Sequence, residues 1–369
     1  MIKFHEPYKA KNTKKYLNQV VERNSYNDNF FMDACLELLS DFYKTKNLLL
    51  THSGTAALEV SAMLLRYSLS NQIETHSIKI PSYTFSSTAN AFIRSGFNVS
   101  FVDIDSENMI LNSSELDCLE DNENLVIVNY ANSTFNYKSS NNIKIIEDAA
   151  QSFGVTFKKQ PVGTFGRYGC VSFHPTKNIH SGYGGLLIVN NAEEFELAKT
   201  IWERGTDRNQ VLSGLKNKYE WVSLGSSFQI NELSSAVLYS QLEVWDKIQK
   251  IRKEIYETYE YNLKKLVEEK HFSTQEINEN IVPNYHAFYI QINDRKTFMD
   301  YMINNNVQTY IGYENLHSSS YAKSNNLNKI LPKTEKYSPR IVRLPFHTNL
   351  TTDDVIYVCK VISNYFELH

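Results

Sequence analysis

The stretch Ser172-Phe-His-Pro-Thr-Lys177-Asn178 follows an apolar run typical of a buried strand and leads into a glycine-rich turn, Ser181-Gly-Tyr-Gly-Gly185. A lysine at the mouth of an apolar site loses hydration, which lowers its pKa and leaves an amine that can attack a carbonyl and form a Schiff base. Taken alone, Lys177 could be an ordinary solvated loop lysine. The hydroxyls of Ser172 and Thr176, with glycines that let the backbone approach a phosphate-bearing ligand, favour a covalent catalyst.

A second group of residues lies upstream, where Ile143-Lys-Ile-Ile-Glu-Asp148 has the pattern of a strand that ends in an acid. Acids at the carboxyl ends of strands in α/β proteins point into the ligand crevice. Asp148 is then placed to pair with a protonated ring nitrogen. Such a pairing makes the ring of pyridoxal phosphate (PLP) an electron sink. The alternative is that Asp148 only caps a helix beginning at Ala149-Ala-Gln151.

A third segment, Leu48-Leu-Leu-Thr-His52-Ser-Gly54-Thr55-Ala-Ala-Leu-Glu59, combines an apolar strand, a turn of small residues and an amphipathic helix. Such a turn aims backbone N–H groups and the positive end of a helix at an anion. Ser53 or Thr55 could also be only the helix N-cap, and the segment lacks the Gly-Lys-Thr of a Walker loop. An anion cradle, a ring-nitrogen acid and an amine nucleophile together meet the requirements of PLP, which carries a phosphate and an aldehyde.

Short apolar runs alternate with helical patterns along the chain, as in α/β proteins. The predicted strands cover residues 47–52, 77–81, 99–103, 124–130, 143–148, 169–174 and 185–190. Helical patterns at 55–69 and 86–95 favour a largely parallel sheet covered on both faces. A long helical pattern at 230–268 follows. We predict a large α/β domain at residues 1–245 and a small C-terminal α+β domain at 246–369, reached through that helix.

The composition excludes several classes of protein. With 369 residues and 42% hydrophobic content, the chain can bury a large core, and a formal net charge of -3 gives no footprint for nucleic acid. The four cysteines show no C-x-x-C spacing, which indicates reduced thiols, and no apolar run is long enough to span a bilayer. We expect a cytoplasmic protein without nucleic-acid or membrane partners and without a metal.

Together with three further segments, these residues resemble the DegT/StrS-type sugar-nucleotide aminotransferases, a branch of the fold-type I PLP enzymes. The further segments are Pro81-Ser-Tyr-Thr-Phe85-Ser-Ser-Thr-Ala-Asn90, Phe101-Val-Asp103-Ile-Asp105 and Arg343-Leu-Pro-Phe346. The resemblance covers nearly the whole chain. It implies a large domain with a mostly parallel mixed sheet between helices, a smaller C-terminal α+β domain, PLP as cofactor, and a homodimer with shared active sites.

The resemblance also implies roles for individual residues. Lys177 matches the Schiff-base lysine, and Asp148 matches the acid that holds the pyridine nitrogen. Gln151 would hydrogen-bond the phenolic oxygen of PLP, and Phe85 would stack on the pyridine face. Gly54, Thr55 and Ser172 match residues that contact the phosphate of PLP. Ser227 would reach the phosphate of the cofactor in the neighbouring subunit. Candidate substrate-binding residues are His317 and, more weakly, Arg208, Tyr219, Tyr310 and Tyr313; His317 could also be a surface loop histidine, and each tyrosine could serve only in packing.

Within the family, four segments resemble the dTDP-4-amino-4,6-dideoxygalactose transaminases. They are Glu203-Arg-Gly-Thr-Asp-Arg208, Lys218-Tyr-Glu-Trp221, Gly225-Ser-Ser227 and Asn284-Tyr-His-Ala-Phe-Tyr289. This resemblance implies amination of dTDP-4-keto-6-deoxy-D-glucose with L-glutamate as donor, in surface polysaccharide or O-antigen synthesis. The departures from the family pattern are Tyr183 in the glycine turn, Asn129 and Asn132 at and beyond the end of the fourth predicted strand, and Asn24-Ser-Tyr-Asn-Asp-Asn-Phe30. They affect substrate identity more than cofactor chemistry.

Three alternatives stay open at this point. The chain could aminate another carbon or another nucleotide sugar, such as a GDP-linked 4-keto or a 3-keto sugar. A dehydratase relative of the same fold would need a residue other than lysine, usually histidine, at position 177. A non-catalytic regulator could retain the fold and even the cofactor, although the intact Lys177 and Asp148 argue against it.

Overall fold

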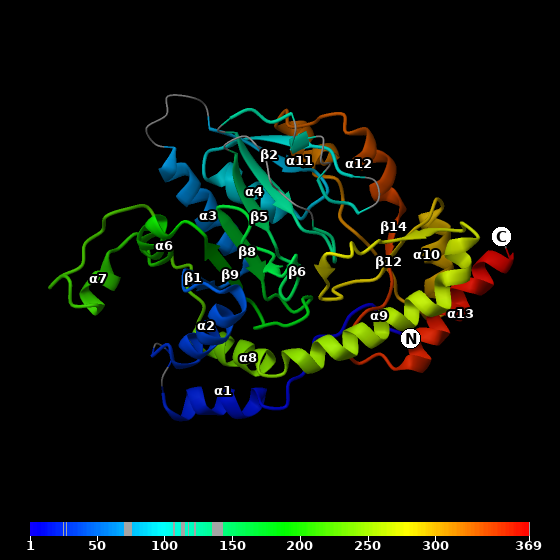
Figure 1. Cartoon of the computed structure of the whole chain (residues 1–369), viewed down its shortest axis with the longest axis horizontal. Coiled ribbons are helices and arrows are strands. Elements are labelled where there is room, and N and C mark those ends of the chain that lie inside the picture. Colours follow the sequence, from blue (N-terminus) through cyan, green and yellow to red (C-terminus); the bar gives the residue numbers. More distant parts are fainter. Residues whose placement is uncertain are drawn as a thin grey trace.

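A seven-stranded sheet forms the centre of the computed structural model, which describes residues 1–24, 26, 28–69, 76–105, 108–111, 115–116, 118–121, 123–134 and 143–368. Its strands are β1 (Leu48–Thr51), β2 (Ser77–Pro81), β3 (Asn98–Val102), β4 (Asn124–Val128), β5 (Lys144–Asp148), β8 (Tyr168–Ser172) and β9 (Gly185–Val189). They lie in the order β1-β9-β8-β5-β4-β2-β3 (Figure 1). All seven predicted strands are therefore confirmed.

The sheet is mixed rather than fully parallel. Strands β3, β2, β4, β5 and β8 pair in parallel, whereas β9 runs antiparallel to both β8 and β1. The segment between β8 and β9 forms no helix, and the chain returns beside β8 in the opposite direction. The predicted, largely parallel α/β sheet is confirmed with this exception at one edge.

Helices pack against the sheet and continue its apolar core. The predicted helices are confirmed as α3 (Gly54–Ser68) and α4 (Ser86–Arg94), and α6 (Phe195–Trp202) lies against α3 and β1. A separate group consists of α1 (Thr13–Glu22), α2 (Phe30–Tyr43) and α8 (Glu232–Leu242). A short helix, α7 (Arg208–Leu212), stands out from the body on an extended segment (Figure 1).

The single long helix predicted at 230–268 is wrong in one respect, because the chain forms two helices there. Helix α8 ends at Leu242, and α9 runs from Trp245 to Glu268. Helix α8 packs against α1 and α2, whereas α9 packs against the C-terminal helix α13 (Thr352–Leu368). At the break, the Trp245 indole fits against Gly154, where a Cβ would lie 2.1 Å from the ring. The break lets the two helices pack in different directions.

A second, four-stranded antiparallel sheet lies beyond α9. It consists of β10 (Ser273–Thr274), β12 (Tyr289–Gln291), β14 (Ile341–Arg343) and β13 (Tyr310–Ile311), in that order. Helices α9, α13 and α10 (Arg295–Asn304) enclose its buried core. A three-stranded sheet is formed by β11 (Ile281–Val282), β6 (Thr156–Phe157) and β7 (Gln160–Pro161). Two further short helices are α11 (Ser320–Ser324) and α12 (Pro332–Tyr337).

The N-terminal residues cross between the two sheets. Ile2 bridges to Val307, and Phe4 accepts from the Phe346 N–H at 3.1 Å, so both belong with the small sheet although we placed them in the large domain. Both chain ends lie at the small-sheet end of the molecule (Figure 1). The boundary predicted after residue 245 coincides with the start of α9, and the division into two domains stays a prediction. Among the described helices, none is both long and apolar enough to cross a membrane.

Candidate active site

Lys177 and Asp148 lie at the carboxyl ends of neighbouring strands. Asp148 is the last residue of β5, and Lys177 lies in the loop after β8, the strand that pairs with β5 in parallel. Ligands of open α/β sheets bind at this edge. The two charges act on each other, since each shifts the pKa of the other group. The structure thus brings together the two residues that the sequence predicted to be catalytic.

The loop that carries Lys177 is tied down from both sides. The Lys177 N–H donates to the His174 carbonyl at 2.9 Å. The next residue, Asn178, donates from Nδ2 to the Asn284 carbonyl at 2.6 Å, which leaves its Oδ1 to accept from Nδ1 of His286 at 2.8 Å. The segment around Asn284, which leads into β12 of the small sheet, therefore holds the lysine loop in place.

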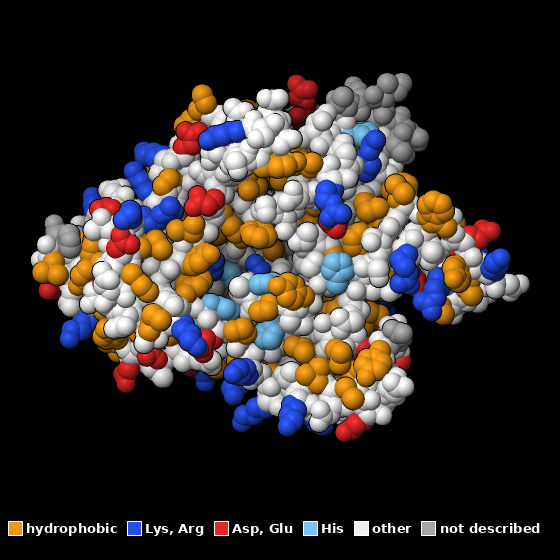
Figure 2. Space-filling model, turned by 180° about the vertical axis from the view of Figure 1, so that it is seen from behind, with side chains coloured by type: hydrophobic (Ala, Val, Ile, Leu, Met, Phe, Trp, Pro, Cys, Tyr) orange, Lys and Arg blue, Asp and Glu red, His pale blue; other side chains and the backbone are white. Residues whose placement is uncertain are grey.

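The surroundings of Lys177 favour its neutral form. Burial lowers the pKa of the Lys177 ammonium to about 8; the Asp148 carboxylate opposes this shift and the Arg343 guanidinium adds to it. Histidine side chains gather around a hollow on one face of the molecule, with Lys or Arg side chains inside it (Figure 2). A pKa this close to neutrality suits an amine that must both take up and release a proton.

Asp148 is buried and held by two donors. The Thr88 hydroxyl donates to its Oδ2 at 2.7 Å, and the Ala150 N–H donates to Oδ1 at 3.1 Å. Burial raises the pKa of Asp148, while the Thr88 and Ala150 bonds and the Lys177 charge counteract the rise. Residues 149–151 form a turn and not a helix, so the alternative of a simple helix N-cap does not hold.

Gln151 connects two parts of the site. Its Oε1 accepts from the Ala131 N–H at 2.8 Å, and its Nε2 donates to the Tyr313 hydroxyl at 2.6 Å. Burial raises the pKa of Tyr313, so its hydroxyl stays protonated. The Tyr313 ring lies 6.5 Å from the ring of Phe85, between centroids. Of the four weaker substrate candidates, Tyr313 is the one placed beside Gln151 and Phe85.

A cradle for an anion forms at the N-terminus of α3. Its N-cap, Ser53, accepts the Ala56 N–H at 3.0 Å, and a Cβ on Gly54 would lie only 2.8 Å from the Ser172 Cβ. Only glycine at position 54 lets the helix start come this close to the end of β8. The Thr55 hydroxyl donates to Ser87 Oγ at 2.8 Å, so a second hydroxyl faces the same turn. The three residues predicted to contact the phosphate thus lie together.

These residues fit PLP part by part. A lysine amine matches the aldehyde, a buried carboxylate matches the ring nitrogen, an amide matches the phenolic oxygen, and a helix N-terminus with hydroxyls matches the phosphate. Phe85, at the N-cap position of α4, is 60% exposed, so its ring is available to lie on a pyridine face. Such stacking contributes about 1 kcal/mol beyond burial.

Five other predicted residues lie outside this group. His317 is 2% exposed; Ser82 Oγ lies 2.6 Å from its Nδ1 and Glu335 3.3 Å from its Nε2, which favours packing over substrate contact and excludes a surface histidine. Tyr310 is exposed on β13 and stacks on Phe4 at 5.3 Å. Arg208 and Tyr219 are exposed on residues 203–227, which we call the arm and which includes α7 (Figure 1). Ser227, also exposed, ends the arm next to Phe228, whose carbonyl accepts the His52 N–H.

The departures from the family pattern have defined positions. Tyr183 is exposed and packs edge-on against His174, with ring centroids 5.1 Å apart. Asn132 is buried, and its Oδ1 accepts the His286 N–H at 3.3 Å, so it braces the lysine loop indirectly. Asn129 is buried and its N–H donates to the Asp148 carbonyl at 3.0 Å. Of the segment 24–30, residues 25 and 27 lie outside the described residues.

Sequence reasoning missed Thr88, Ser87 and the pairing of Tyr313 with Gln151. Thr88 and Ser87 lie in the quoted segment 81–90, whose run of hydroxyl residues was the available signal. Nothing local could connect Tyr313 with Gln151, because 162 residues separate them in the chain. The distant contacts therefore come only from the tertiary structure.

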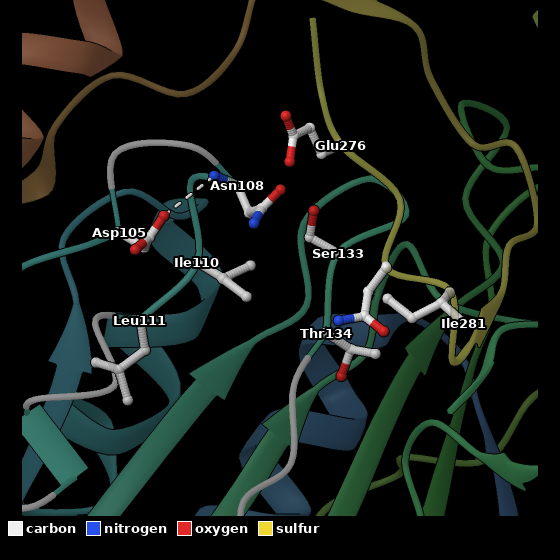
Figure 3. Close-up of a pocket in the computed structure, with 9 residues that line it drawn as sticks. Asp105, Asn108, Ile110, Leu111, Ser133, Thr134, Glu276 and Ile281 are labelled. Atoms are coloured by element: carbon white, nitrogen blue, oxygen red, sulfur yellow. Dashed lines mark hydrogen bonds between the residues drawn. The ribbon is translucent and has the colours of Figure 1, made fainter. Parts of the chain in front are cut away.

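The structure also has a hollow of about 200 Å³ (Figure 3). It is lined by the loop after β3, by Ser133 and Thr134 after β4, and by the segment from Glu276 to Ile281. None of its lining residues is a predicted site residue. Within the described ranges, no cluster of three His, Cys, Asp or Glu side chains could hold a metal ion.

Comparison with known proteins agrees with this geometry. A model of the DegT/DnrJ/EryC1/StrS aminotransferase family matches residues 7–363. GDP-perosamine synthase of Vibrio cholerae is 24% identical over 388 residues, 99% of each chain. UDP-2-acetamido-2-deoxy-3-oxo-D-glucuronate aminotransferase of Pseudomonas aeruginosa is 24% identical over 335 residues, 88% of each chain. The PLP form of a sugar aminotransferase from Streptococcus pneumoniae has the same fold, with a TM-score of 0.87 at 17% identity over 100% of this chain and 99% of that one.

The family match spans nearly the whole chain, and the site contains a group for each part of the cofactor. The chain therefore belongs to the DegT/DnrJ/EryC1/StrS aminotransferase family and is a PLP-dependent sugar-nucleotide aminotransferase.

Proposed function

We propose that the enzyme transfers the amino group of L-glutamate to dTDP-4-keto-6-deoxy-D-glucose and forms dTDP-4-amino-4,6-dideoxy-D-galactose. The position of Lys177 and Asp148 at the same edge of the sheet supports the proposal of transamination. The segments 203–208, 218–221, 225–227 and 284–289, which resemble the transaminases of this sugar, support the choice of substrate. We place the reaction in the cytoplasm, in surface polysaccharide or O-antigen synthesis, on the same resemblance.

In this proposal one base serves both half-reactions. PLP, held by Lys177, Asp148, Gln151 and Phe85, would supply a carbonyl group that can take up an amino group and an electron sink that stabilises the carbanion. The Nζ of Lys177 takes the proton from Cα of the donor and later delivers a proton to C4 of the sugar, which fixes the configuration of the new amine. Asp148 would keep the ring nitrogen of PLP protonated, and Gln151 and Phe85 would hold the PLP ring beside Lys177.

The active enzyme is proposed to be a homodimer. The arm at residues 203–227 exposes a row of large apolar side chains, namely Leu212, Leu215, Tyr219, Trp221, Val222 and Leu224. Apolar side chains gathered on one projecting segment are typical of a surface covered by a partner. A second copy of the chain is the proposed partner, because Arg208, Tyr219 and Ser227 lie on this arm and would then act in the neighbouring site.

A GDP-linked 4-keto sugar is the second candidate substrate. The observation in its favour is the match to GDP-perosamine synthase over 99% of both chains. The 24% identity leaves room for a change of nucleotide, because nucleotide recognition depends on few side chains.

The test is a visible spectrum of the PLP-loaded protein before and after L-glutamate, followed by either keto sugar with mass analysis of the product. We expect L-glutamate to bleach the chromophore, and dTDP-4-keto-6-deoxyglucose to restore it with formation of an aminated dTDP-sugar. Recovery with the GDP-linked sugar alone would replace the dTDP assignment by the second candidate. A chromophore that no amino acid bleaches would point to a non-catalytic relative and remove the proposal.

A further inference from the structure

The N-terminal segment, residues 1–10, connects the small sheet with the loop that carries Lys177. It runs from the small-sheet end of the molecule toward α1 (dark blue in Figure 1). At the small sheet, the Phe346 N–H donates to the Phe4 carbonyl at 3.1 Å, and the Phe4 N–H donates to Oε1 of Gln308 at 3.2 Å. Every residue of the segment is described and none lies in a helix, so its position depends on contacts of this kind.

His5 joins the N-terminal segment to the lysine loop. Its ring Nε2 lies 2.8 Å from the Pro175 carbonyl oxygen, two residues before Lys177. A carbonyl oxygen can only accept a hydrogen bond, so Nε2 carries the proton of the neutral ring and donates it. This bond fixes the backbone at the start of the turn that carries Lys177.

The surroundings of His5 keep its ring neutral. Burial lowers the pKa of His5 to about 4, against the effect of the bond to Pro175. The positive charges of Arg252 and Arg343 add to the lowering. At neutral pH the ring is therefore an uncharged donor with its proton on the nitrogen that faces the loop, which suits a fixed contact better than proton transfer.

A second histidine makes the same kind of contact on the other side of Lys177. The ring Nε2 of His180 donates to the Tyr8 carbonyl at 2.9 Å. Its Nδ1 accepts the Gly182 N–H at 3.2 Å, which agrees with a proton on Nε2. Gly182 has a φ of +79° and belongs to the glycine turn. The N-terminal segment is thus bonded to the lysine loop two residues before Lys177 and three residues after it.

The position of the loop matters because the amine of Lys177 must come within hydrogen-bond reach of the proton that it moves. A small displacement of a catalytic group lowers the rate strongly. The bond from the Lys177 N–H to the His174 carbonyl lies within the loop, so it cannot fix the loop relative to the rest of the protein. The bonds of His5 and His180 do so, because they join the loop to a distant segment.

We propose that the N-terminal segment positions the lysine loop through His5 and His180, and that His5 is a positioning residue for the proton transfers of Lys177. This inference rests on the role proposed for Lys177. His5 acts through the Pro175 carbonyl and transfers no proton itself. Because Phe4 is bonded to the small sheet, the same segment holds the loop and the small sheet in one arrangement.

The first test uses hydrogen–deuterium exchange of the cofactor-free protein, with thermal unfolding to show that each variant is folded. We expect peptides from residues 173–184 to exchange about 2- to 12-fold faster in His5→Leu, the factor for one lost hydrogen bond between neutral groups. His5→Gln keeps an N–H donor and should exchange as the wild type. Glu6→Gln, which weakens only a surface ion pair with Lys3, is the control on the same segment and should also match the wild type.

The second test follows the chromophore of the PLP-loaded proteins in stopped-flow experiments. In His5→Leu we expect two saturated rates to fall by the same factor, about 2- to 12-fold, because one lysine serves both steps. These are the rate of bleaching by L-glutamate and the rate of recovery with the keto sugar that restores the wild-type chromophore. The half-saturating concentrations should not change, and His5→Gln should restore both rates.

Unchanged exchange of residues 173–184 in His5→Leu would overturn the proposal. A defect in only one of the two steps, or a His5→Gln variant as impaired as His5→Leu, would also overturn it. If no amino acid bleaches the wild-type enzyme, the proposed function fails. The exchange experiment on the cofactor-free protein would still decide whether the N-terminal segment holds the lysine loop.

Discussion

Thr88 shows how one hydroxyl can set the chemistry of a buried acid. Its bond to Oδ2 lowers the pKa of Asp148, against the effect of burial, which raises it. Asp148 must be ionised to hold a protonated ring nitrogen. Thr88 itself is positioned by a hydroxyl of the same helix start, Thr84, at 2.8 Å. It is thus a positioning residue for the cofactor acid.

We predict that Thr88→Val raises the pKa of Asp148 and lowers the rate at neutral pH by about 10- to 150-fold, the worth of one hydrogen bond to a charged group. Because Asp148 is then protonated over a wider range, the acidic limb of the kcat/KM profile should move to higher pH. Thr88→Ser keeps the donor and should retain the wild-type profile. Identical pH profiles for Thr88→Val and the wild type would show that Thr88 does not act through Asp148.

The buried Lys177 side chain affects the stability of the protein as well as its turnover. In the folded protein its pKa is about 8, below the ordinary value of 10.5. Between these values the unfolded chain carries the charge and the folded chain does not, so wild-type stability falls as pH falls through this range. We predict that cofactor-free Lys177→Met is about 1–3 kcal/mol more stable than the wild type at pH 7, and similar at pH 10.5 or above.

Urea unfolding of the cofactor-free proteins at the two pH values measures this difference. Lys250→Met, an exposed lysine on α9, is the control and should show no such dependence. The loaded Lys177→Met protein should have no measurable turnover. Wild-type turnover in this variant, or a stability gain that is the same at both pH values, would contradict the role given to Lys177.

At the scale of elements, the site depends on how closely α3 approaches β8. A Cβ on Gly54 would lie 2.8 Å from the Ser172 Cβ, closer than such atoms approach in proteins. The rest of α3 packs against β8 and β9, so the helix cannot simply move away. The phosphate cradle and the sheet packing therefore use the same contact.

We predict that Gly54→Ala lowers the free energy of unfolding by about 1–3 kcal/mol, as overpacking does, and weakens PLP binding. Adding Ser172→Gly removes the clashing Cβ and should restore most of the stability but not the affinity for PLP, because a hydroxyl is lost. Thermal unfolding and PLP titration of the two variants separate these effects. Full stability of Gly54→Ala would mean that the helix start can shift away from β8.

At the scale of the whole molecule, the arm is held by its own ion pairs although it stands apart from the body. Buried Glu203 pairs with Arg208 at 2.8 Å, and buried Asp207 pairs with Lys216 and accepts the Glu220 N–H at 2.7 Å. These bonds fix the arm while its apolar side chains stay exposed. An ordered segment with an uncovered apolar surface suits an interface that is preformed before association.

We predict that the wild type sediments as a dimer and that Trp221→Glu shifts it to monomer with loss of activity. Trp221 is 77% exposed on the arm, and a charge there would have to be buried in the dimer. Tyr261→Glu on α9, where the native ring is 82% exposed, is the control and should remain dimeric. An active monomeric wild type would remove the shared-site proposal.

Several features followed from the sequence because they depend on neighbours in the chain. Strands β1, β4 and β9 have continuous apolar runs, as buried strands require, whereas β2 and β3 alternate apolar and polar residues. The helices α3 and α4 follow turns of small or hydroxyl residues. Lys177, Asp148 and Gly54 each lie directly at or beyond the end of such a strand. Their meeting at one sheet edge follows from the parallel order of the strands, so the central part of the site was predictable.

Other features were decided only by the tertiary structure. The break between α8 and α9 has no proline or glycine to signal it, and it arises because the two helices pack against different partners. Thr88 lies 60 residues from Asp148, and Tyr313 lies 162 residues from Gln151. His317 shows the reverse case, because its surroundings bury a residue that a loop pattern would leave exposed.

The difference between the features that the sequence predicts and those that it does not has a physical reason. Hydrophobic periodicity reports which face of an element is buried, and the strand ends then report where ligands bind. The periodicity carries no information about which distant side chain fills the space beside a given group. The sequence by itself therefore determined the fold, the lysine, the acid and the anion cradle, whereas tertiary packing decided the Asp148–Thr88 bond and the Gln151–Tyr313 bond, since each joins segments that lie far apart in the chain.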